Sequence, residues 1–207
     1  GVVVACDADA ALLAGVDGPT VQGDATRLPV RDDAVDLAVC QALLVNLPDP
    51  AAAIREFARV SSDLVAAIEP DNSQVDLSST VEAEAPLARR ARERYLEGVR
   101  TDATIGDASA LFREVGLEVV SVRRYDHGRT VAPPYDDRDV EAARRKASGE
   151  GLAVDRDQIL AGEASPEEYE ALREDWRAMG REVVAQMQTG DYRQREVVPF
   201  YVTVGRV

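Results

Sequence analysis

The first seventy residues alternate short apolar runs with segments of helical spacing. Strands are predicted for the apolar runs at residues 2–6, 20–22, 35–40 and 64–68. Helices are predicted over residues 9–14 and 50–60, the second beginning with Pro50, which suits a first helical turn. Short apolar strands that alternate with helices predict a parallel sheet covered by helices on both faces.

After Pro70 the rhythm changes to longer, more polar helical segments. A charged helix is predicted over residues 81–100, and a helix and strand follow over 108–115 and 117–125. Ser165-Pro166-Glu167-Glu168 is a capping box with proline at the first helical position, and apolar residues recur from Tyr169 to Met187. An apolar run at 197–204 predicts a closing strand.

The composition of the chain argues against some classes of function. The chain has 207 residues, a formal net charge of −14 and 24 basic residues, of which Lys146 is the only lysine. This balance disfavours binding to a nucleic-acid backbone, and no apolar run is long enough to span a bilayer, so we expect a cytoplasmic protein. An acidic, lysine-poor composition is typical of proteins in concentrated salt, and a GC-rich gene is the alternative explanation.

The most informative residue is Asp7, which follows the first apolar run. A carboxylate at the end of a buried strand is a common acceptor for the two hydroxyls of a ribose. A second acidic stretch, Gly23-Asp24-Ala25, follows the second run after a helix-length interval. This order predicts a nucleoside-binding site at the carboxyl ends of the strands.

The motifs resemble those of class I S-adenosylmethionine-dependent methyltransferases, in the branch that acts on small molecules. The resemblance is carried, in order, by Val4-Ala5-Cys6-Asp7-Ala8-Asp9, Gly23-Asp24-Ala25-Thr26-Arg27-Leu28-Pro29, Asp32-Asp33-Ala34-Val35-Asp36-Leu37, Leu43-Leu44-Val45-Asn46-Leu47-Pro48-Asp49-Pro50 and Ile68-Glu69-Pro70. It implies an α/β fold with a Rossmann-like parallel sheet, helices on both faces, an antiparallel last strand and a helical insertion or lid.

The resemblance also implies roles for individual residues. Asp7 would bind the ribose of S-adenosyl-L-methionine, and Ala8 would lie against the adenine. Asp24 and Ala25 would hold the adenine edge, and the carboxyl-end pair Cys40-Gln41 would contact the cofactor through backbone atoms. For Asp7 the simpler alternative is a helix cap, and for Asp24 it is a turn.

The family's first strand and glycine-rich turn have no counterpart in this sequence, and we expect an upstream segment that supplies them. On this reading the chain has five parts. They are residues 1–70 as half of the cofactor-binding core, 71–106 as a helical lid, 107–126 as a helix and strand of the core, 127–195 as a helical insertion or lid, and 196–207 as the closing strand.

Catalytic residues are less evident. His127, the only histidine, is a weak candidate for a general base, because we expect the preceding strand to end near Asp126. Five aromatic residues are candidates for an acceptor pocket or for core positions: Tyr95, Tyr125, Tyr135, Trp176 and Tyr192. Glu69, at a strand end, is expected either to bind a substrate hydroxyl or to cap the chain. No metal site is expected, since one histidine and two separated cysteines do not form a zinc tetrad.

Cys6 and Cys40 are expected to be buried free thiols. Two inter-strand steps separate their predicted strands by about 9.5 Å, beyond the roughly 7 Å that a disulfide permits. The leading hypothesis is therefore methyl transfer to a small-molecule acceptor. The apolar stripe from Tyr169 to Met187 suits a homodimer interface as well as a lid. Two alternatives stay open: a nicotinamide-dependent oxidoreductase, although Lys146 has Ala142 rather than tyrosine four residues earlier, and a non-catalytic Rossmann-like binding protein.

Overall fold

A computed structural model describes all of residues 1–207, which divide into two compact units. Unit 1 consists of residues 1–70, 104–125 and 200–207, and unit 2 consists of residues 71–103 and 126–199. The chain therefore leaves unit 1 and returns to it twice. Each unit has its own apolar core, and each is described separately below.

The sheet of unit 1 has parallel strands and one antiparallel strand. β3 (Val35–Gln41) pairs in parallel with β4 (Ser61–Pro70). β7 (Gln194–Arg206) pairs with β4 in antiparallel fashion, from Leu64 opposite Arg206 to Pro70 opposite Phe200. β1 (Ala5–Asp7) and β2 (Thr20–Gln22) form a separate parallel pair. The carboxyl ends of β1 and β2 therefore meet at one edge.

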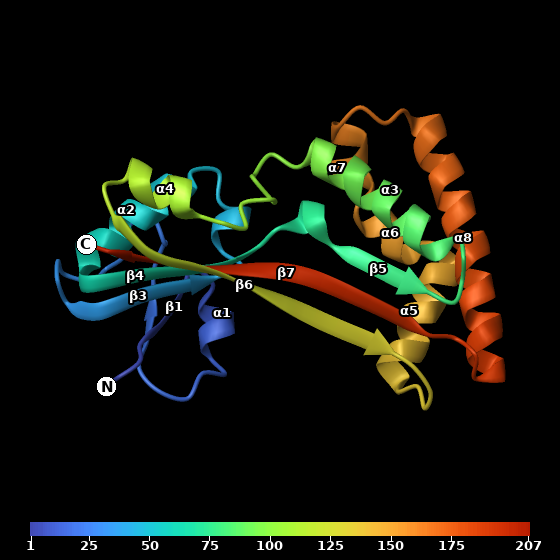
Figure 1. The fold of residues 1–207 in the computed structure, drawn as a ribbon, viewed down its shortest axis with the longest axis horizontal. Coiled ribbons are helices and arrows are strands. Elements are labelled where there is room, and N and C mark those ends of the chain that lie inside the picture. The colour runs from blue at the N-terminus through green and yellow to red at the C-terminus, as the bar shows by residue number, and fades with distance from the viewer. The chain divides into compact units, whose positions relative to one another are not determined.

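Helices cover the sheet of unit 1, and Figure 1 shows α2 and α4 together on one side of it. α1 (Ala10–Leu13) follows β1, α2 (Pro50–Val60) connects β3 to β4, and α4 (Ser109–Glu114) precedes β6 (Glu118–Val131). A short 3-10 helix, η1 (Leu44–Asn46), precedes α2. The buried core between helices and sheet includes Cys40, Leu44, Ile54, Phe57, Val65 and Phe112.

Unit 2 is mainly helical. It begins with η2 (Asn72–Gln74), β5 (Asp76–Ser79) and α3 (Glu84–Gly98). Four further helices follow: α5 (Asp137–Ser148), α6 (Glu150–Val154), α7 (Arg156–Ala161) and α8 (Pro166–Thr189). β5 pairs in antiparallel fashion with the first residues of β7, so unit 2 has a small sheet beside its helices. None of the helices combines the length and the apolar character that a membrane span requires.

Local signals set the ends of the long helices. The Ser165 hydroxyl accepts a hydrogen bond from the Glu168 N–H, and the Glu168 carboxylate accepts one from the Ser165 N–H. This is the capping box expected from the sequence. Gly190 ends α8 with φ 77°, a left-handed conformation that glycine adopts without a steric penalty. Asp136 begins α5 with a capping box of the same kind, formed with Asp139.

The predicted fold class is confirmed, and α2 has the predicted bounds. Two strand predictions were wrong. β5 was not expected, because its four residues carry a single apolar side chain, Leu77. β6 continues to Val131 rather than ending at Tyr125, and its second half is exposed, so no apolar alternation marked it in the sequence.

Candidate functional site

Asp7 is the last residue of β1 and is partly exposed. Its Oδ1 accepts a hydrogen bond from the Asp9 N–H at 2.8 Å, while Asp9 itself caps α1 by accepting from the Ala11 N–H. The Asp7 Oδ2 has no hydrogen-bond partner within the chain. The cap of the following helix is therefore Asp9, and Asp7 retains acceptor capacity for a ligand.

The second acidic stretch lies directly beside the first. The Gly23 N–H donates to the Asp7 carbonyl at 3.0 Å, and the side chain of Gln22 donates to the Ala8 carbonyl at 2.9 Å. Asp24 Oδ1 accepts from both the backbone N–H and the hydroxyl of Thr26, each at 2.8 Å, and these bonds hold the Asp24 pKa below its usual value. The turn thus favours the ionised form of Asp24 and orients its carboxylate.

A charged cluster on α2 anchors the segment that follows Asp24. Glu56 accepts from the Leu28 N–H at 2.7 Å, and Arg59 donates to the Leu28 and Val30 carbonyls at 3.2 and 2.9 Å. Arg59 also forms an ion pair with Glu56. Ala25 and Leu28 in turn pack against the core cluster of unit 1. The turn is therefore fixed to the same core that contains the end of β3.

At the end of β3, Cys40 is buried and Gln41 is exposed. The Cys40 thiol lies 3.6 Å from Glu69 Oε1, and burial together with this carboxylate raises the pKa of the thiol well above its usual range. Glu69 is fully buried and accepts from the N–H groups of Leu43 and Leu44 at 3.1 Å. Glu69 therefore caps the chain at η1, the second of the two roles expected for it.

The free hydrogen-bonding groups of this region fit an adenosyl group. Asp7 and Asp24 each use only Oδ1 within the chain, and the Ala25 backbone N–H makes no hydrogen bond. Carboxylate oxygens suit ribose hydroxyls and an exocyclic amine, and a backbone N–H suits a ring nitrogen. Asp7, Ala8, Asp24 and Ala25 thus lie together, and the cluster against which Ala25 packs includes Cys40.

Two details of the sequence reading were wrong. His127 does not follow the end of a strand, because β6 runs through it to Val131, and it lies in unit 2 with its side chain exposed. Cys6 is exposed rather than buried, because its strand has a single sheet neighbour, β2. Both cysteines are free, as expected.

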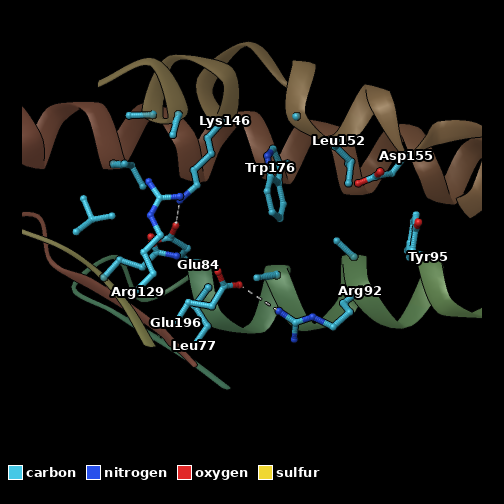
Figure 2. Close-up of a pocket in the computed structure, with 18 of the residues that line it drawn as sticks. Leu77, Glu84, Arg92, Tyr95, Arg129, Lys146, Leu152, Asp155, Trp176 and Glu196 are labelled. Atoms are coloured by element: carbon cyan, nitrogen blue, oxygen red, sulfur yellow. Dashed lines mark hydrogen bonds and ion pairs between the residues drawn. The ribbon is translucent and has the colours of Figure 1, made fainter. Parts of the chain in front are cut away.

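Unit 2 contains a cavity of about 480 Å³, shown in Figure 2. Three of the five aromatic residues considered from the sequence line it: Tyr95, Trp176 and Tyr192. Tyr135 instead donates to the Tyr192 carbonyl at 2.9 Å, and Tyr125 is exposed. Charged side chains also line the cavity, among them Glu84, Lys146 and Asp155.

Sequence reasoning missed these charged residues. Glu84 is 1% exposed, and it accepts hydrogen bonds from Ser79, Lys146 and Tyr192. The one available signal was that Lys146 is the only lysine in the chain. Glu84, Lys146 and Tyr192 lie in separate segments, so no local motif connects them.

Comparison with known proteins finds a family model that matches part of the sequence and solved structures with a similar fold. The model of a methyltransferase domain matches residues 1–63, and no curated protein matches the sequence. A protein of Bacillus halodurans C-125 assigned as a methyltransferase is 15% identical, with a TM-score of 0.50, over 99% of this chain and 82% of that chain.

Two S-adenosylmethionine-dependent methyltransferases are also similar. The protein from Methanosarcina mazei is 15% identical with a TM-score of 0.46, covering 99% of this chain and 81% of that one. The protein from Mesorhizobium loti is 14% identical with a TM-score of 0.47, covering 100% of this chain and 80% of that one.

The matched model is that of a methyltransferase domain, in agreement with the resemblance found in the motifs. Residues 1–63 carry the sequence of a methyltransferase domain, and the chain has the fold of the class I S-adenosylmethionine-dependent methyltransferases, as its motifs predicted.

Proposed function

We propose that this protein transfers a methyl group from S-adenosylmethionine to a small-molecule acceptor. The observation that carries the proposal is the hydrogen-bonded arrangement of Asp7 and Asp24 at the adjacent carboxyl ends of β1 and β2, inside the segment that matches the methyltransferase-domain model. Ligands of open α/β sheets bind at this edge.

In this proposal Asp7 accepts hydrogen bonds from the ribose hydroxyls, and Ala8 lies against the adenine. Asp24 accepts from the exocyclic amine and the Ala25 N–H donates to a ring nitrogen, while Cys40 and Gln41 contribute backbone atoms. The Thr26 bonds, which orient Asp24 and favour its ionised form, support its role as an acceptor. When bound, the cofactor would supply a methyl group on a sulfonium: the acceptor would bond to the methyl carbon in line as the carbon–sulfur bond breaks, and S-adenosylhomocysteine would leave.

The chain's own contribution to catalysis is then mainly positioning and exclusion of water, which suffice to accelerate such a displacement. Two observations support a small acceptor. The net charge of −14 disfavours a nucleic-acid backbone as the substrate. The cavity in unit 2, of about 480 Å³, has the volume of a small organic ligand. We propose the segments 71–106 and 127–195 as the part that holds the acceptor.

The test is titration calorimetry of the natural full-length protein with S-adenosylmethionine and with S-adenosylhomocysteine. We expect saturable binding, and we expect Asp7→Asn to weaken it by about tenfold or more, since a charge-assisted bond contributes about 1.5–3 kcal/mol. Asparagine keeps the Oδ1 that accepts from Asp9, so the turn itself is preserved.

The matched control is Asp17→Asn, an exposed acid of the same unit outside the proposed site. It should bind the cofactor as the unmodified protein does. Equal binding by Asp7→Asn and by the control would remove the ribose role. Binding of the cofactor without methyl transfer to any of a panel of small acceptors would instead favour a non-catalytic binding protein.

A further inference from the structure

The cavity of unit 2 has two chemically different ends. Its walls come from α3, α5, α6 and α8, and side chains of β5, β6 and β7 line one end. Figure 2 shows Lys146, Arg129 and Glu84 gathered at that end, and Asp155, Leu152 and Tyr95 together at the other, with Trp176 between them. Four carboxylates and three basic side chains line the space. The charged side chains of the lining therefore sum to one net negative charge.

The basic side chains of the cavity are already satisfied by the chain. Lys146 donates to the buried carboxylate of Glu84 and lies 3.3 Å from the Tyr192 hydroxyl. Tyr192 also donates to Glu84, at 2.9 Å, and burial beside this carboxylate raises the Tyr192 pKa far above its usual value. A phenol held neutral in this way remains a donor, so the Glu84 carboxylate stays compensated.

The two arginines are paired as well. Arg92 donates to the Val75 carbonyl at 3.1 Å and lies 3.7 Å from Glu196, as the dashed line in Figure 2 marks. Arg129 donates to Asp139 at 3.3 Å. An anionic ligand would have to compete with these carboxylates for every cation on the wall. The cavity is therefore poorly suited to an anion.

Asp155 is the unpaired charge. It lies between α6 and α7, yet its side chain caps neither helix and forms no hydrogen bond or ion pair. Loss of water around the carboxylate raises its pKa. A desolvated carboxylate without a partner is unfavourable, and a cation or a hydrogen-bond donor that reaches it compensates for the lost hydration.

The surroundings of Asp155 suit a cation attached to an apolar body. Tyr95 and Leu152 lie beside it, and the Trp176 ring extends into the space between α3 and α8 (Figure 2). Aromatic faces attract ammonium groups, and most strongly where water is excluded. The remaining wall includes Ala88, Ala91 and Leu96, which contribute apolar surface for the rest of a ligand.

We propose that the cavity of unit 2 binds a small primary amine with an apolar body, its ammonium group against Asp155 and its body against Tyr95, Leu152 and Trp176. The proposal depends on unit 2 alone and does not rest on the proposed methyl transfer. The volume of about 480 Å³ accommodates a ligand of one or two rings.

Trp176 is the only tryptophan, so its fluorescence reports on this cavity directly. The full chain is titrated, without cofactor, with 2-phenylethylamine, with phenylacetate and with 2-phenylethanol, which share a phenyl body and differ in charge. We expect a saturable change in emission with the amine, and affinities lower by about tenfold or more for the anion and the alcohol, since each lacks the charge pair with Asp155.

Two variants complete the test. Asp155→Asn should weaken amine binding by about tenfold or more, whereas Asp157→Asn, an acid two residues away with a side chain 92% exposed, should leave it unchanged. Circular dichroism checks that both variants are folded, and the comparison of amine with anion needs no variant at all.

Three results would overturn the proposal. The first is that Asp155→Asn and the unmodified chain bind the amine equally well. The second is that phenylacetate binds as tightly as the amine. The third is that none of three amines, 2-phenylethylamine, cyclohexylmethylamine and 4-phenylbutylamine, gives a saturable response. Because these titrations contain no cofactor, their failure is separate from a failure of S-adenosylmethionine to bind.

Discussion

At the scale of residues, the buried carboxylate of Glu84 organises unit 2. It is 1% exposed and accepts hydrogen bonds from three side chains that reach it from different segments: Ser79, Lys146 and Tyr192. A charge buried to this degree is tolerated only when donors replace its lost hydration. Each donor is therefore worth more to stability than a comparable group on the surface.

Tyr192→Phe removes one of these donors and leaves the rest of the ring in place. We expect the free energy of unfolding to fall by about 1–3 kcal/mol, the usual effect of leaving a buried charged acceptor short of a partner. Urea unfolding followed by circular dichroism measures it. Tyr125→Phe is the matched control, since that ring is 54% exposed, and it should change stability by less than about 0.5 kcal/mol. Equal effects of the two variants would contradict the role of Tyr192.

Asp155, unlike the donors to Glu84, lowers the stability of the folded protein at neutral pH. Because desolvation raises its pKa, the folded state holds the proton more tightly than the unfolded state does. Its favourable contribution is therefore fully present below the unfolded pKa of about 3.9 and is lost as the pH rises through the raised folded pKa.

Asp155→Asn should consequently be more stable than the unmodified chain at pH 7, and this difference should disappear below about pH 4. Urea midpoints measured between pH 4 and pH 7.5 test the sign. A variant that is less stable than the unmodified chain at pH 7 would show that Asp155 has a partner in the folded protein.

At the scale of elements, the close crossing of α5 and α8 depends on a glycine. A Cβ built on Gly180 would lie 2.3 Å from the Ala147 nitrogen and 2.3 Å from the Lys146 carbonyl carbon, both backbone atoms of α5. Backbone atoms cannot move aside as a flexible side chain does. Any side chain at this position must therefore separate the two helices.

Gly180→Ala should lower the free energy of unfolding by about 1–3 kcal/mol, even though alanine is the better helix former, because the overpacking outweighs the helix propensity. Thermal or urea unfolding measures this. The control is Gly151→Ala in α6, where the nearest atom to an added Cβ is the Arg145 carbonyl oxygen at 3.9 Å. That variant should be neutral or slightly stabilised. If both variants gained stability, the crossing would not require glycine.

At the scale of the whole molecule, charge is the dominant feature. A net charge of −14 on 207 residues makes the folded chain repel itself, and salt screens that repulsion. We therefore expect the midpoint of thermal unfolding to rise by several degrees between 0.05 M and 1 M KCl. A midpoint that falls over this range would mean that attractive ion pairs outweigh the repulsion.

Much of the fold could be predicted from the sequence because its signals are local. The bounds of α2 follow from Asp49, which caps its start, and from proline at the next position, while the capping box at Ser165 marks the start of α8. Apolar runs ending in acidic residues placed Asp7 and Asp24 at the carboxyl ends of β1 and β2. Because parallel strands carry ligands at these ends, the candidate cofactor site followed from strand order.

Local signals did not extend to the exposed part of the sheet. β5 and the second half of β6 have little apolar alternation, and both strands belong to the sheet through pairing with β7. The prediction that the strand ends before His127 failed for this reason. The assignments of Asp7, Ala8, Asp24, Ala25, Cys40 and Gln41 to the cofactor stay predictions until binding is measured.

The sequence by itself thus determined the α/β class, the strands from β1 to β4 and the residues at the ends of β1 and β2, because each depends on neighbours within a few positions. Only the tertiary structure showed which side chains of unit 2 meet around Glu84 and at the cavity. Lys146 and Tyr192 reach Glu84 across 62 and 108 residues, and Asp155 meets Tyr95 and Trp176 at a cavity whose walls come from several helices. Such contacts have no periodicity, because packing rather than sequence spacing brings their side chains together.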